Sequence, residues 1–153
     1  MLGICAGYQM LGRRIVDDVE SGAGVVEGLG WLPVETVYAA DKLVRASDGS
    51  ALGQSVTGYQ IRHGRPRGAS GTAWLELDGE AEGAASADGR VRGTSLHGLF
   101  EADGFRRAFL RRLGHEAGDW SYAGAREAYV DRLADWLDTN LGLGRVEALL
   151  TGR

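Results

Sequence analysis

The single cysteine of the chain, Cys5, lies between two glycines in the sequence Gly3-Ile4-Cys5-Ala6-Gly7. A G-x-C-x-G pattern between an apolar stretch and a helix-like stretch is typical of a nucleophile elbow, a sharp strand-to-helix turn. There the nucleophile takes a strained backbone conformation, and Gly3 and Gly7 are needed because larger side chains would collide with the neighbouring strand and helix. The turn also aims the sulfur at a helix N-terminus, which favours thiolate over thiol. The pattern predicts a reactive cysteine; the alternative is a small buried hydrophobe, since free cysteine is among the most buried residue types.

A nucleophilic cysteine needs a base, and the chain has three histidines, His63, His97 and His115. His97 is the best placed, because it ends a predicted strand and precedes Gly98, where the side chains of a sheet meet their ligands. His63 lies in an arginine-rich loop, and His115 follows a predicted helix. An imidazole beside Cys5 would take the thiol proton and later protonate a leaving amine. We therefore expect His97 to be the base, with a ring nitrogen about 3–4 Å from the sulfur.

The composition limits the classes of function. The 153 residues are 44% hydrophobic, which is enough for the core of one ordinary domain. The formal charge of −4, from 17 basic and 21 acidic residues, argues against nucleic-acid binding, and no apolar run approaches the roughly 20 residues of a membrane span. A single cysteine excludes an intramolecular disulfide and a multi-cysteine zinc site, so we expect no metal site and a reducing cytoplasm. The first residues include no basic segment, which predicts that no signal peptide precedes the chain.

Apolar periodicity and turn residues predict the elements that position these side chains. Helical spacing behind Cys5 predicts a helix to about residue 18. Strands are predicted at residues 31–38, 42–45, 56–62, 72–77 and 90–96, with a turn at residues 40–41. The last two strands flank two turn dipeptides, Asp78-Gly79 and Asp88-Gly89, and we expect these strands to pair. Amphipathic patterns then predict packed helices around residues 105–113 and 129–137, and a short last segment around 146–150.

Several blocks of the sequence together resemble one family. Residues 3–12, Gly-Ile-Cys-Ala-Gly-Tyr-Gln-Met-Leu-Gly, are similar to the nucleophile motif of class I glutamine amidotransferase domains, in the branch found at the C-terminus of cobyric acid synthase. Residues 28–34 (GLGWLPV), 41–42 (DK), 58–61 (GYQI) and 93–100 (GTSLHGLF) follow in the family's order and at similar separations, so the resemblance covers nearly the whole chain. Two related branches share the nucleophile and histidine blocks and are alternatives: cobyrinic acid diamide synthases and the amidotransferase partner of a peptidoglycan-amidating ligase.

The resemblance implies glutamine hydrolysis through a Cys–His dyad. Cys5 would attack the side-chain carboxamide of glutamine, His97 would transfer the proton, and the backbone amide of Ala6 would stabilise the oxyanion. Many class I amidotransferases have a glutamate two residues after the histidine, where this chain has Leu99. In the family, a separate synthetase domain or chain uses the ammonia, with ATP and Mg²⁺, to amidate carboxylates of adenosylcobyrinic diamide in cobalamin biosynthesis. Glutamine hydrolysis itself needs no cofactor.

The implied fold is α/β, with the flavodoxin-like sheet of class I amidotransferases. In the family the nucleophile lies well inside the domain, so we expect residues 1–153 to form a partial amidotransferase domain without its N-terminal strands. We also expect residues 1–4 to be too few for a central strand. The family often has Glu and His where this chain has Gln60 and Arg62, and no role is assigned to either. Two alternatives remain: a nonenzymatic or split remnant that binds a partner chain, and a Cys–His hydrolase with another acyl substrate.

Overall fold

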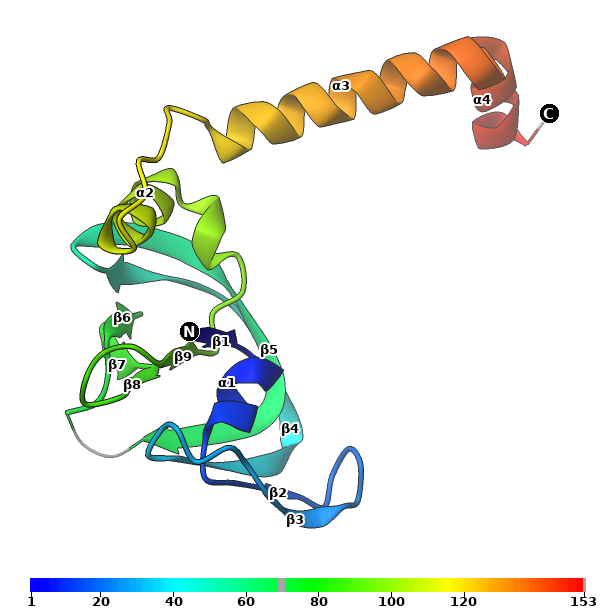
Figure 1. Cartoon of the computed structure of the whole chain (residues 1–153). Coiled ribbons are helices and arrows are strands. Elements are labelled where there is room, and N and C mark those ends of the chain that lie inside the picture. Colours follow the sequence, from blue (N-terminus) through cyan, green and yellow to red (C-terminus); the bar gives the residue numbers. More distant parts are fainter. Residues whose placement is uncertain (69–70, 153) are drawn as a thin grey trace. The chain divides into compact units, whose positions relative to one another are not determined.

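The computed structural model describes residues 1–68 and 71–152 of the chain. The chain divides into two compact units, Met1–Ala117 and Gly118–Arg153. The first unit combines strands with short helices and contains both Cys5 and His97. In the second unit the described elements are helices (Figure 1).

A small sheet leads to Cys5. Its strands are β1 (Leu2–Ile4), β9 (Arg92–Thr94) and β8 (Ala84–Ala85), in the order β1-β9-β8. β1 and β9 are parallel, with Gly3 opposite Gly93, and β8 is antiparallel to β9. Residues 2–4 do form a strand, but it lies at the edge of this sheet and not at its centre, so the expectation that residues 1–4 are too few for a central strand is not contradicted. β9 supplies a parallel partner, and the Met1 ammonium and carbonyl form hydrogen bonds with the backbone of Arg90 and Arg92.

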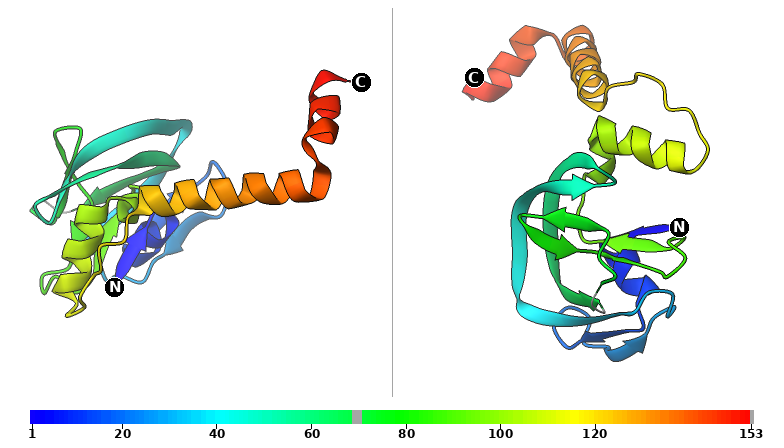
Figure 2. Two further views of the ribbon diagram at one scale, coloured as in Figure 1. Left: turned by 90° about the horizontal axis from the view of Figure 1, so that it is seen from above. Right: turned by 90° about the vertical axis from the view of Figure 1, so that its left-hand side faces the viewer.

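A second, larger sheet contains β3 (Gly24–Glu27), β2 (Arg14–Asp17), β4 (Val34–Ala51), β6 (Leu75–Leu77) and β7 (Glu80–Glu82), in that order, with β5 (Gln54–Gly68) also paired to β4. β4 and β5 form one long, curved antiparallel hairpin, which Figure 2 shows from two further directions. The strands predicted at residues 56–62 and 72–77 lie within or overlap β5 and β6. The predicted pairing of the strands at residues 72–77 and 90–96 is wrong, however: β6 pairs with β4 and β7, whereas β9 lies between β1 and β8.

The helix after Cys5 is shorter than predicted. α1 (Ala6–Leu11) ends before Gly12, whose backbone is extended, and the next residues form β2 instead of another helical turn. A Cβ added at Gly12 would lie 2.6 Å from the Val34 carbonyl oxygen, so the chain leaves the helix where it passes close to β4. The β-branched residues Ile15 and Val16 then lie between β3 and β4, which suits their restricted side chains.

Of two turns predicted from the sequence, the one at Asp78-Gly79 is confirmed and the one at residues 40–41 is wrong. The turn predicted at residues 40–41 is a β-bulge instead, because β4 continues and only its register against β5 shifts between Tyr38 and Leu43. Asp78 and Gly79 do connect β6 and β7, with φ angles of 54° and 81°. Both residue types tolerate this left-handed backbone, which a tight hairpin turn requires.

Two apolar clusters pack the segments next to Cys5 and His97. The first joins strands β4, β5 and β6 to η1 (Leu99–Glu101) and α2 (Asp103–Arg112), and its fully buried members include Leu96, Leu99 and Phe105. The second contains Tyr8 and Leu11 of α1 together with residues near β4 and β8. The helix predicted at residues 105–113 is confirmed as α2, with Phe105 on its buried side.

The second unit consists of α3 (Tyr122–Leu141) and α4 (Leu143–Thr151). Ser121 caps α3 by accepting a hydrogen bond from the Gly124 amide. The amphipathic pattern predicted a packed helix, but α3 has no buried residue, and Trp136 is 58% exposed. Within its own unit, therefore, the predicted packing of this helix is not found; an apolar pattern marks a face that prefers burial and does not itself supply a partner. No helix within residues 1–68 and 71–152 is long and apolar enough to cross a membrane.

Candidate functional site

Cys5 joins β1 to α1 in a strained conformation. Its φ of 54° and ψ of −113° lie outside the regions that residues with a Cβ readily adopt, and it occupies the N-cap position of α1. Its amide donates a 2.9 Å hydrogen bond to the carbonyl oxygen of Thr94, the last residue of β9. The structure therefore contains the strand, sharp turn and helix that the sequence predicted.

The two glycines beside Cys5 are not equivalent. A Cβ added at Gly3 would lie 2.6 Å from Leu11 Cδ1 and 2.7 Å from the Gly7 carbonyl group, so the strand and the helix touch at Gly3 as expected. A Cβ added at Gly7 would meet nothing within 4 Å. The steric reason predicted for Gly7 is therefore wrong. Gly7 contributes backbone that lies against Gly3, and its own missing side chain faces open space.

Ala6 is the first residue of α1 and is exposed. The first amides of a helix have no acceptor within that helix. The first hydrogen bond of the helix joins the Gln9 amide to the Cys5 carbonyl oxygen at 3.1 Å, and it does not involve the Ala6 amide. The Ala6 amide follows the nucleophile directly, which suits the oxyanion role expected of it.

His97 follows the end of β9 by three residues. Because β1 and β9 are adjacent and parallel, Cys5 and the segment that carries His97 leave the sheet at the same edge. The backbone of His97 pairs with that of Tyr59 on β5 through hydrogen bonds of 2.8 and 3.2 Å. The two rings are stacked, with centroids 4.9 Å apart and planes 6° from parallel. Among the described residues, the buried Nε2 of His97 has no hydrogen-bond partner.

The sulfur of Cys5 faces the same strand, β5. Its Sγ lies 3.9 Å from the Ile61 carbonyl oxygen, two residues from the Tyr59 that stacks on His97. The hydrogen bonds of residues 1–68 and 71–152 include none between Cys5 and the His97 ring, so the expected approach of about 3–4 Å stays a prediction. The other two histidines lie elsewhere: His63 Nδ1 is 2.9 Å from the Ala39 carbonyl oxygen, and His115 follows α2.

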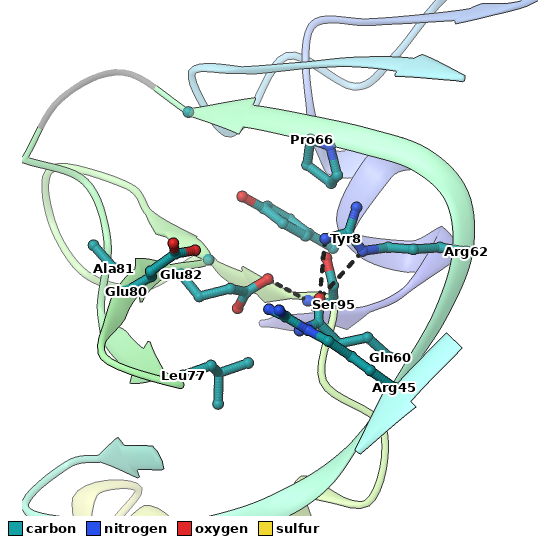
Figure 3. A pocket seen from close by; sticks show the side chains of 12 residues that line it. Tyr8, Arg45, Gln60, Arg62, Pro66, Leu77, Glu80, Ala81, Glu82 and Ser95 are labelled. Carbon is teal, nitrogen blue, oxygen red and sulfur yellow. Dashed lines mark hydrogen bonds between the residues drawn. The ribbon is translucent and has the colours of Figure 1, made fainter. Parts of the chain in front are cut away.

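Glu82 belongs to this site, and the sequence did not reveal it. Its carboxylate accepts hydrogen bonds from the Thr94 hydroxyl at 2.6 Å and from the Ser95 amide at 2.9 Å. It also lines a cavity of about 240 Å³ together with Tyr8 and Arg62 (Figure 3). No local motif marks this residue, because its partners lie 12 and 13 positions further along the chain.

Arg62 is held in place on the β5 side of the cavity. Its guanidinium donates to Gln60 Oε1 at 3.0 and 3.3 Å and to the Gly64 carbonyl oxygen at 2.6 Å. Burial, and then the positive charge of Arg65, lower the pKa of Arg62, while the negative charges of Glu82 and of a Cys5 thiolate act in the opposite sense. The arginine thus lies within electrostatic reach of both residues.

Among the described residues, no three Asp, Glu, His or Cys side chains gather as a metal site would require.

The sequence of residues 1–105 matches the CobB/CobQ-like glutamine amidotransferase domain. The chain belongs to this family. The resemblance drawn from the motif blocks is therefore confirmed, and so is the enzyme class. Family membership, with the mixed sheets and flanking helices, also confirms the predicted α/β fold class of a glutamine amidotransferase.

Curated relatives of this amidotransferase domain are named cobyric acid synthase. The protein of Nocardia farcinica is 44% identical over 172 residues, covering 99% of this chain and 33% of its own length. Those of Cereibacter sphaeroides and Rhodobacter capsulatus are 47% and 50% identical, each covering 97% of this chain and 32% of the relative. The chain thus spans about a third of the length of the curated relatives it matches. A crystal structure described as a glutamine amidotransferase is 21% identical, with a TM-score of 0.46, and covers 74% of this chain and 60% of its own.

The extent of the amidotransferase domain remains a prediction. The family match ends at residue 105, the first compact unit ends at Ala117, and the prediction was one partial domain over residues 1–153.

Proposed function

We propose that this chain hydrolyses glutamine, with Cys5 as the nucleophile and His97 as the general base and acid. The observation that carries the proposal is the strained turn at Cys5, which lies beside the end of β9, the strand that leads to His97. A strained φ persists only where the surrounding fold offsets its energy. Such conformations cluster at functional sites, where they place a reactive group.

The reaction would proceed in two steps. The Cys5 thiolate adds to the carboxamide carbon of glutamine, the Ala6 amide donates to the oxyanion, and the proton taken by His97 passes to the leaving ammonia. This leaves a thioester between Cys5 and the γ-carbonyl group. His97 then takes a proton from water, hydroxide displaces the sulfur, and glutamate and the free thiol are released.

We also propose that the ammonia serves the amidation carried out by a cobyric acid synthase. The relatives carry that name, and this chain corresponds to about a third of their length. A synthetase domain or chain would use ATP and Mg²⁺ to activate carboxylates of adenosylcobyrinic diamide, which the ammonia then attacks. A reducing cytoplasm is the proposed compartment, because it keeps the Cys5 thiol free.

Release of glutamate from glutamine tests the hydrolytic step. The wild-type chain should release glutamate, Cys5→Ala should release none, and His97→Ala should be slower by about 10²–10⁴-fold. A glutamine-analogue alkylator should label Cys5, and glutamine should protect it. Absence of both release and labelling would contradict the proposal for this chain and favour the interpretation that it acts only with a partner.

A further inference from the structure

The His97 ring has no carboxylate partner among the described hydrogen bonds, and the residue two positions further along the chain is Leu99. Its ring is oriented by stacking on Tyr59, and its backbone by pairing with the same residue. Stacking fixes the plane of the ring but leaves the path of the chain from β9 to His97 to be fixed by other contacts. Two of those contacts are made by Glu82.

One carboxylate organises three successive residues of that path. Glu82 accepts from the Thr94 hydroxyl and from the Ser95 amide, and the same hydroxyl oxygen accepts from the Leu96 amide at 3.1 Å. Thr94, Ser95 and Leu96 are almost completely buried, so water is a poor substitute for the carboxylate. Losing it would leave a buried amide and a buried hydroxyl without their acceptor, which is costly enough to move the backbone.

The same contact extends to the nucleophile. Thr94, which Glu82 holds through its side chain, accepts the hydrogen bond from the Cys5 amide through its carbonyl oxygen. A displacement of Thr94 therefore shifts the turn at Cys5 as well as the segment that leads to His97. Such displacements matter because a misplacement of about 1 Å can cost a reaction about 10²-fold.

Glu82 is itself placed by backbone that is closely fitted to β9. It ends β7, opposite Leu75 of β6. The next residue, Gly83, has a φ of 73°, and a Cβ there would lie 2.5 Å from the Gly93 carbonyl oxygen. The β6–β7 hairpin thus delivers the carboxylate to one place, at the end of β9, on the side of the cavity opposite Arg62 (Figure 3).

We infer that Glu82 is a positioning residue, which acts through Thr94 and Ser95 to set Cys5 and His97 relative to each other. The inference rests on the proposed function, since it concerns the same pair of residues. The carboxylate of Glu82 acts through Thr94 and Ser95, and not through a hydrogen bond to the imidazole.

The alkylation rate of Cys5 by iodoacetamide at pH 7 tests the inference, because Cys5 is the only cysteine and the reagent needs no glutamine site. Glu82→Ala should react about 10-fold or more slowly than wild type. Glu82→Gln should stay within a few-fold of wild type, because its amide can accept from Ser95 and donate to the Thr94 oxygen. The matched control is Glu80→Ala, which removes an exposed carboxylate from the same cavity and should react as wild type does.

A double variant separates positioning from general loss of structure. If Glu82 acts through the Cys5–His97 pair, Glu82→Ala combined with His97→Ala should react no more slowly than His97→Ala alone. Additive losses, or a Glu82→Ala rate equal to that of Glu80→Ala, would overturn the inference. In the glutaminase assay, Glu82→Ala should lower kcat with little change in KM.

The two proposals can fail separately. A chain that releases no glutamate but shows the non-additive alkylation pattern contradicts the proposed hydrolysis and retains the positioning role. A chain whose release of glutamate depends on Cys5, but is unchanged by Glu82→Ala, retains the function and overturns the inference.

Discussion

Cys5 combines a reactive side chain with a backbone conformation that a residue with a Cβ disfavours. Its φ of 54° belongs to the region where glycine is usual, and yet a glycine there would have no sulfur. Strain of this kind costs about 1–3 kcal/mol, and packing of the surrounding elements must offset it. At residue 5 the proposed reaction needs a side chain that carries sulfur, whereas the backbone conformation favours a residue without a Cβ.

Replacing Cys5 by glycine should therefore abolish activity while it stabilises the fold relative to Cys5→Ala. Alanine keeps the Cβ and its strain, whereas glycine removes the strain and adds chain entropy to the unfolded state, so we expect a net gain of about 1 kcal/mol for glycine over alanine. Urea unfolding of the two variants measures the difference. Equal stabilities would show that the strain at residue 5 is no larger than the chain entropy that glycine adds to the unfolded state.

Asp17 links the charge of one side chain to stability in acid. Desolvation would raise its pKa, but hydrogen bonds from the Ser21 hydroxyl and from the amides of Glu20, Val19 and Ser21 outweigh it, and the pKa lies at about 2, against an ordinary 3.8. A carboxylate with a lower pKa in the folded state stabilises the fold above the unfolded pKa and loses that contribution as the pH falls.

The wild-type chain should therefore lose stability relative to Asp17→Asn as the pH falls from about 4 to about 2. Urea midpoints at half-unit intervals of pH provide the measurement. Asparagine does not titrate, so the variant isolates this one carboxyl group from the others. Parallel curves for the two proteins would contradict the low pKa.

At the scale of elements, the site depends on how closely β1, β9 and α1 approach one another. Gly3 lies against α1, and Gly93 lies against the Tyr8 ring, whose Cδ2 would be 1.9 Å from an added Cβ. These glycines let α1 lie close to both parallel strands, with the Tyr8 ring packed directly on the backbone of β9. Cys5 is placed by that contact, and not by its local sequence alone.

Gly3→Ala should accordingly destabilise the chain by about 1–3 kcal/mol, since the added methyl group meets backbone that cannot give way. Gly7→Ala is the matched control. Its added Cβ has open space, and alanine is the better helix former by about 1 kcal/mol, so we expect equal or slightly higher stability. Thermal or urea unfolding distinguishes them, and a similar loss for both variants would refute this picture of the elbow.

At the scale of the whole molecule, the chain consists of two units joined by residues 113–121, which have no helix or strand. Exposed segments without backbone pairing are preferred sites of proteolysis. Glu116 lies in this segment and is exposed. It provides one defined site for a protease specific for glutamate.

Limited digestion with such a protease should cleave after Glu116 before it cleaves within α3, where Glu127 lies in hydrogen-bonded helix. Mass spectrometry of the first products gives the cut site. Glu116→Gln should slow the first cleavage and leave later ones unchanged. First cleavage at Glu127 would mean that α3 opens more readily than the connecting segment.

The sequence by itself determined the features that depend on neighbouring residues. The glycines and the cysteine of residues 3–7 predicted a strand-to-helix turn, and Asp78-Gly79 predicted a hairpin turn, because positive φ angles and close approach restrict residue type locally. The motif blocks likewise indicated the family that the comparison over residues 1–105 confirmed.

Only the tertiary structure decided what depends on distant partners. α1 ends at Leu11 because β4 passes close to Gly12, β1 exists because β9 pairs with it, and Glu82 meets Thr94 because the β6–β7 hairpin brings it there. α3, by contrast, has an apolar pattern with no buried residue. Periodicity states which face of a segment prefers burial, but strand pairing and side-chain contacts are fixed by the energy of segments that meet across the fold.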